Sequence, residues 1–136
     1  MENSRNISLE NINLNLACEE VRIARVKLKA RIEVLELCAA NLQELMCFSR
    51  EQLVTAMEGL TSPAHLRSEM QKHLKDAECL IGLIRKHWRH LTGRINHPEL
   101  LPPARDDFIR LRSKYIHLEN DIIFYLAYIE YRYNND

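Results

Sequence analysis

The feature that most constrains this chain is the scarcity of residues that break helices. The first glycine is Gly59, the first proline is Pro63, and most of the others lie between Gly93 and Pro103. Long stretches without glycine or proline favour long helices. The chain is therefore predicted to be all-α, an antiparallel bundle of three long helices with coiled-coil-like packing, or of four if the first helix breaks near Ser49.

Length and composition are typical of one folded domain. The 136 residues are 46% hydrophobic and 28% charged, and a chain of this size can bury a core without help from disulfides or metals. We predict a single helical-bundle domain over 1–136 with a flexible start at 1–10. Its helices are expected at about 11–59, 63–92 and 103–133.

The first predicted helix carries apolar residues on two faces. One stripe advances in steps of three and four residues and is interrupted only by Arg31. It consists of Leu14, Ala17, Val21, Ala24, Leu28, Leu35, Cys38, Leu42 and Leu45. A second stripe, roughly opposite, consists of Ile23, Val26, Ala30, Val34 and Leu37. A helix with two apolar faces needs neighbours on both sides.

Two local signals in this segment leave alternatives open. Residues Val26 to Val34 alternate between apolar and charged, which is also typical of a half-buried strand. The surrounding Ala, Leu, Glu, Lys and Arg are good helix formers and favour a helix. Further on, Ser49 and Gln52 have the spacing of a capping box, which could open a new helix.

The unequal lengths of the helices suggest a function. At 1.5 Å per residue the first helix would run about 70 Å and the other two about 45 Å each. Apolar side chains on an overhanging end would face water, and burying a Leu or Val is worth about 1.5 to 3 kcal/mol. We therefore expect an interaction or adaptor module, a homo-oligomer or a binder of another helical protein. The expected contact residues are Leu14, Leu16, Val21, Ile23, Ala24, Leu28, Tyr128 and Tyr131.

Charge offers a weaker, local signal for nucleic acid. Nineteen basic and nineteen acidic residues cancel, so no global field draws the chain to nucleic acid or to an anionic membrane. A group of basic residues with one aromatic ring nevertheless lies at the end of the second predicted helix: Arg85, Lys86, Trp88, Arg89 and Arg94. Such a group can hold phosphates and stack bases. It is equally typical of a solvated helix end, where cations are favoured.

An enzymatic alternative comes from arginine and histidine at a five-residue spacing, seen in Arg85 with His90 and in Arg112 with His117. The second pair resembles the R-x4-6-H motif of the HEPN ribonucleases, small all-helical proteins that commonly dimerise and cleave RNA across the dimer interface. The resemblance implies His117 as acid or base and Arg112 as a phosphate ligand. Ser113 departs from the Asn, Asp or His that usually follows this arginine.

The remaining reactive residues predict no metal site and no cofactor. The four cysteines lack C-x-x-C spacing and lie in helical segments, so we expect buried free thiols and a reducing intracellular compartment, cytoplasm or nucleus. His87 and His90 could share a helix face, but no second ligand pair completes a set. Charged residues interrupt every apolar run before the eighteen or so residues of a membrane span, so no membrane partner is expected.

Overall fold

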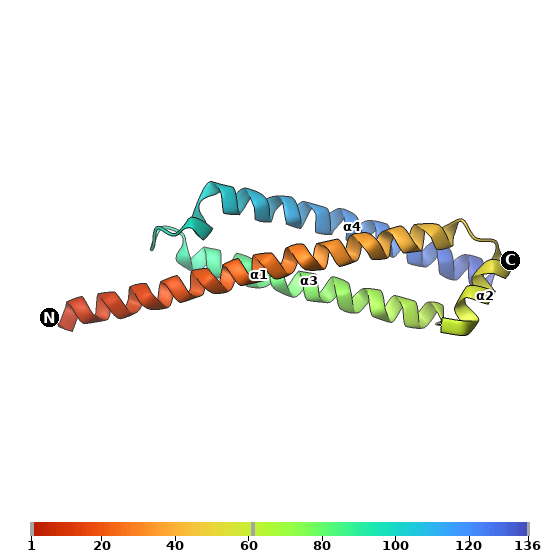
Figure 1. The fold of residues 1–136 in the computed structure, drawn as a ribbon, viewed down its shortest axis with the longest axis horizontal. Helices are drawn as coiled ribbons and strands as arrows, with labels where there is room; N and C mark the ends of the chain where they lie inside the picture. Colours follow the sequence, from red (N-terminus) through yellow and green to blue (C-terminus); the bar gives the residue numbers. More distant parts are fainter. Residues whose placement is uncertain (1, 61, 136) are drawn as a thin grey trace. The chain divides into compact units, whose positions relative to one another are not determined.

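The structure, a computed structural model, describes the backbone of residues 2–60 and 62–135 and the side chains of 9–58 and 62–135. Its elements are α1 (Glu2–Met46), α2 (Arg50–Leu60), α3 (Pro63–Leu91), the short 3-10 helix η1 (Pro98–Leu100) and α4 (Pro102–Asn134) (Figure 1). The described ranges contain helices and no strand. The all-α bundle is confirmed, and the strand alternative for residues 26–34 is wrong because they lie inside α1.

The first predicted helix is two helices. α1 ends at Met46, and the backbone N–H of Ser49 then donates to Oε1 of Gln52 at 2.8 Å. The N–H of Gln52 donates in return to Oγ of Ser49 at 3.2 Å. This reciprocal pair is a capping box, which satisfies two backbone donors that a helix start leaves free. The described residues therefore form four α-helices, the alternative that the sequence left open.

The other helix ends follow local chemistry. α1 begins at Glu2, nine residues before the expected start, whereas α3 begins at the expected Pro63. The hydroxyl of Ser62 accepts from the N–H of His65 at 3.1 Å and caps α3. After α3, Gly93 adopts a φ of +83°, a left-handed conformation that favours glycine.

The chain forms two compact units, and each is assembled from separate stretches of sequence. Unit 1 consists of Met1–Ala30 and Glu78–Arg112, and unit 2 consists of Arg31–Ala77 and Ser113–Asp136. Each of α1, α3 and α4 thus contributes one segment to each unit. The two units are described separately below.

Unit 1 is held together by a small apolar core. Its buried side chains include Cys18, Val21, Ala24 and Leu28 on α1, Ile84 and Leu91 on α3, and Phe108 and Leu111 on α4. Nη2 of Arg94, just past the end of α3, lies 2.7 Å from Oε1 of Glu10 near the start of α1. α3 therefore runs antiparallel to α1 in this unit (Figure 1).

Unit 2 has its own core and its own ion pairs. Its buried side chains include Ile32, Leu35, Leu42, Leu53, Met57, Met70, Leu74, Ile122, Leu126 and Ile129. Arg67 near the start of α3 donates to both carboxylate oxygens of Glu130 near the end of α4, at 2.6 and 2.8 Å. α3 and α4 are therefore antiparallel in unit 2 as well.

The groups that could carry metal or redox chemistry are dispersed. All four cysteines are free thiols, with Cys18 buried and Cys38 half-buried. The expectation of buried thiols is wrong for Cys47 and Cys79, which are exposed. Burial raises the pKa of the Cys18 and Cys38 thiols. No three His, Cys, Asp or Glu side chains gather in metal-binding geometry within the described part of the chain. No described helix combines the length and hydrophobicity that a bilayer span requires.

Candidate functional site

An exposed apolar face runs along α1 in unit 1. We call it the outer stripe: Leu9, Ile12, Leu16, Ile23 and Val26, with 59, 53, 59, 44 and 55% of each residue exposed. At 100° per residue these positions fall within about 100° of the helix circumference. Their three- and four-residue steps are those of a coiled-coil seam. The outer stripe lies on the side of α1 opposite the core residues Val21 and Leu28.

The outer stripe exists because α1 is apolar on both sides while α3 and α4 cover only one. Glu19 occupies the one charged position along the stripe, and its carboxylate accepts from Nε of Arg22 at 3.0 Å. The local charge there is thus balanced within α1. What remains is a row of aliphatic side chains in water, a common mark of a protein contact surface.

The contact residues expected on α1 differ in their exposure to solvent. Leu16 and Ile23 are exposed members of the outer stripe, and Leu14 is half-buried. The core residues Val21, Ala24 and Leu28 are at most 4% exposed, because they pack inside a single copy. The expectation that these three face a partner therefore needs correction. Leu9 and Ile12 were missed, although they continue the same three- and four-residue spacing towards the N-terminus.

The two tyrosines expected on α4 lie in unit 2 and differ from each other. Tyr131 is 63% exposed, beside an equally exposed ring at Phe124 one heptad earlier. Tyr128 is half-buried, and its hydroxyl accepts from Nη1 of Arg132 at 3.1 Å. Tyr131 is thus available to a partner, whereas Tyr128 is engaged within its own helix.

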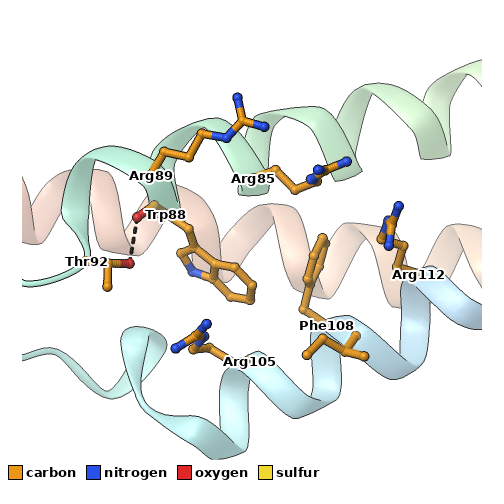
Figure 2. A pocket seen from close by; sticks show the side chains of 8 residues that line it. Arg85, Trp88, Arg89, Thr92, Arg105, Phe108 and Arg112 are labelled. Carbon is orange, nitrogen blue, oxygen red and sulfur yellow. Dashed lines mark hydrogen bonds between the residues drawn. The ribbon is translucent and has the colours of Figure 1, made fainter.

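A second surface feature of unit 1 is a shallow hollow of about 370 Å³ between α3 and α4 (Figure 2). We call it the arginine hollow. It is lined by Arg85, Trp88, Arg89 and Thr92 from α3 and by Arg105, Phe108, Ile109 and Arg112 from α4. Trp88 packs edge-on against Phe108, with ring centroids 4.8 Å apart, and Arg105 lies over the Trp88 ring at 6.0 Å.

Only some of the basic residues expected at the end of α3 line the arginine hollow. Arg85, Trp88 and Arg89 line it, whereas Lys86 does not and Arg94 is paired with Glu10. Two arginines from α4, Arg105 and Arg112, take their place. The sequence analysis did not name Arg105, and it named Arg112 only as a phosphate ligand of the ribonuclease alternative, because both arginines follow a loop and belong to another helix.

The arginine and histidine of the ribonuclease alternative line different hollows. Arg112 lines the arginine hollow of unit 1, and His117 lines a hollow of unit 2 with Glu36, Lys114, Leu118 and Asp121. Five positions along an α-helix turn through about 500°, which places the two side chains about 140° apart around α4. No His, Cys, Asp or Glu is among the described residues that line the arginine hollow. The ribonuclease reading stays a prediction.

A buried ion cluster that the sequence did not reveal joins three elements of unit 1. Arg25 of α1 donates to Glu99 of η1, with Nε 2.5 Å from Oε1, and also to Asp107 of α4. Hydrogen bonds from Arg110 and Arg25 lower the pKa of Asp107, and those to Glu99 and Asp107 raise the pKa of Arg25. The charges satisfy one another, so this cluster is structural.

Comparisons with protein-family models, with curated proteins and with solved structures find no match to this chain. The outer stripe and the arginine hollow are therefore the two candidate functional surfaces of the chain.

Proposed function

We propose that this chain is a helical interaction module that pairs with a second copy of itself through the outer stripe of α1. The observation that carries the proposal is the row of five exposed aliphatic side chains at coiled-coil spacing. A second helix with the same spacing could pack its side chains between them. Within one copy, α3 and α4 occupy only the opposite side of α1.

Charge beside the stripe favours two antiparallel copies of α1. In a parallel pair, Glu19 would face its own counterpart in the seam, and Arg22 would lie near Lys27 of the other copy. Both contacts are repulsive. In an antiparallel pair that sets the two stripes against each other, Leu9 lies opposite Val26 and Ile12 opposite Ile23 of the other copy. Glu19 then lies opposite Leu16 rather than opposite a second Glu19.

The energies predict a weak dimer. Each stripe side chain is about half exposed, so burial contributes about 1 kcal/mol, or on the order of 10 kcal/mol for the ten side chains of two copies. Association costs about 4 to 15 kcal/mol in lost freedom of motion. At the low end of that cost about 6 kcal/mol of binding energy remains, so we expect dissociation in the range of tens of micromolar, where concentration controls assembly.

The test is sedimentation of the full chain over about 1 to 200 µM, a range that brackets the expected affinity. We expect a monomer–dimer equilibrium that Ile23→Glu abolishes and the matched substitution Asn11→Glu leaves intact. Asn11 is exposed on α1 outside the stripe. Val21→Glu is unsuitable because Val21 is buried, and a charge there would unfold the monomer. A wild-type chain that stays monomeric throughout would overturn the proposal.

Crosslinking tests the direction of the partner helix. Copies with Leu9→Cys mixed with copies with Val26→Cys should form a disulfide-linked heterodimer on oxidation, because antiparallel stripes set these two positions opposite each other. The wild-type chain, which carries the exposed Cys47 and Cys79, gives the background of unrelated crosslinks. Efficient linking of Leu9→Cys copies to one another, with no heterodimer in the mixture, would contradict the antiparallel pairing of two copies.

A further inference from the structure

We propose that the arginine hollow is a binding site for single-stranded nucleic acid. Four arginines from two helices line this one shallow depression (Figure 2): Arg85 and Arg89 from α3, and Arg105 and Arg112 from α4. This site is separate from the outer stripe and does not depend on self-association. The hollow combines unbalanced positive charge, an aromatic floor and a hydrogen-bond donor without a partner among the described residues.

The charge at the hollow is unbalanced. No described Asp or Glu forms an ion pair with any of these four arginines, although other arginines of unit 1 are paired: Arg22, Arg25, Arg94 and Arg110. The lining residues include no acidic side chain. Four guanidinium groups without counter-charges make a local positive field in a chain whose net charge is zero. An anion with several charges would be attracted there.

The distribution of the arginines suits an extended anion. Arg85 and Arg89 lie one turn apart on α3, and Arg105 and Arg112 lie seven residues, or about 10 Å, apart on α4. Charges spread over this length can contact successive phosphates of one strand. A single small phosphate could engage only part of the set. Guanidinium groups also bind phosphate oxygens in pairs of parallel hydrogen bonds.

The floor of the hollow is aromatic and apolar. Trp88 and Phe108 meet edge to face, and the aliphatic Ile109 lies beside them. Phe108 is only 3% exposed and supports the half-buried Trp88, whose ring can accept an unstacked base. Such a contact is worth about 1 to 3 kcal/mol per base and tolerates different sequences. A phosphorylated peptide carries the anionic group but not the planar bases. The combination of ring and arginines therefore favours nucleic acid over phosphopeptide.

Trp88 also brings a donor that the chain does not satisfy. Its indole Nε1 is buried and has no hydrogen-bond partner among the described residues. A buried donor without an acceptor costs about 1 to 3 kcal/mol. A phosphate or base oxygen that reached this nitrogen, as Trp88 adjusts to a ligand, would remove the cost. Trp88 is thus the residue most sensitive to an occupant.

The experiment uses the single tryptophan of the chain as the reporter. A twelve-residue oligouridylate is titrated into the full chain while Trp88 fluorescence is recorded, and anisotropy of a labelled oligomer gives an independent affinity. We expect quenching and saturable binding, with log affinity falling against log salt at a slope of about −2 to −3 for four phosphate contacts. An unchanged fluorescence and anisotropy would overturn the proposal.

Variants then locate the site. Arg85→Ala and Arg112→Ala should each weaken binding about five- to tenfold and make the salt slope shallower by nearly one. Lys86→Ala is the matched control, because Lys86 is exposed next to Arg85 but does not line the hollow. An equal loss in this control would mean diffuse attraction and would contradict the assignment. Tighter binding of a phosphoserine peptide than of the oligouridylate would also contradict it.

Discussion

Arg25 and Glu99, 74 residues apart in the chain, form an ion pair that joins α1 to η1 in unit 1. Nε of Arg25 lies 2.5 Å from Oε1, and Nη2 lies 3.3 Å from Oε2. Glu99 is only 4% exposed, so its carboxylate depends on this guanidinium for a counter-charge. Breaking such a pair from one side leaves an uncompensated buried charge.

Arg25→Met should therefore lower the free energy of unfolding by about 3 kcal/mol. Urea denaturation followed by helical circular dichroism measures the loss. The control is Arg22→Met, which removes an α1 arginine whose pair with Glu19 is 48% exposed on both sides. An exposed pair contributes less than about 1 kcal/mol. Equal losses in the two variants would contradict a structural role for the Arg25 cluster.

Acid should weaken the fold through the two carboxyl groups with lowered pKa values. Hydrogen bonds from Arg110 and Arg25 lower the pKa of Asp107, and a hydrogen bond from Arg67 lowers that of Glu130. A group whose pKa is lower in the folded state stabilises the fold above its unfolded value, about 4. That contribution is lost as pH falls through the lowered folded value.

The measurement is the free energy of unfolding from urea titrations between about pH 6 and pH 3, a window set by the unfolded carboxyl pKa. Wild type should lose stability across the lower part of this range. The free energy of unfolding of Asp107→Asn should be lower than that of wild type at pH 6 and should fall less steeply towards pH 3, because one of the two carboxyl groups no longer titrates. A variant with the slope of wild type would show that Asp107 does not contribute to the pH dependence.

The capping box at Ser49 is expected to stabilise the start of α2. Ser49→Ala removes the oxygen that accepts from the N–H of Gln52 and should cost about 1 kcal/mol. The matched control is Ser68→Ala, in an exposed interior position of α3, where alanine is the better helix former and a small gain is expected. Thermal or urea denaturation of both variants checks the contrast, and a gain from Ser49→Ala would exclude the cap.

Two glycines should respond to alanine in opposite directions. Gly82 lies in the middle of α3, and a Cβ added there meets nothing within 4 Å, so Gly82→Ala should stabilise by about 0.5 to 1 kcal/mol. Gly93→Ala places a side chain at a φ of +83° and should destabilise by about 1 kcal/mol or more. Paired urea denaturation curves give both values. The same sign for both variants would contradict this assignment.

Local patterns predicted the fold where each signal lay within a few residues. The range 63–92 predicted for the second long helix agrees with α3, and the spacing of Ser49 and Gln52 marked the break after α1. The early start of α1 was missed because its first turns are rich in asparagine, a residue with modest helix propensity. Local helix propensity also contains no information on the contacts that α1 makes with α3 and α4.

The surfaces were harder to predict because exposure depends on which helix covers which face. The sequence marked two apolar faces on α1, but only the positions of α3 and α4 decide that Val21 is buried while Ile23 is exposed. The same limit applies to Arg112, whose relation to Trp88 arises between helices. Arg25 belonged to neither stripe, and its partner Glu99 lies in the short helix η1, 74 residues away.

The assembly of unit 1 from Met1–Ala30 and Glu78–Arg112 has a consequence during synthesis. A ribosome that adds about 5 to 20 residues per second needs roughly 4 to 16 s to translate from residue 30 to residue 112. Until its part of α3 has been made, the nascent α1 segment displays both apolar faces without a neighbour from unit 1, and the α4 segment arrives last. This chain is thus expected to engage chaperones at the ribosome, and to close its first core only when Phe108 and Leu111 emerge from the exit tunnel.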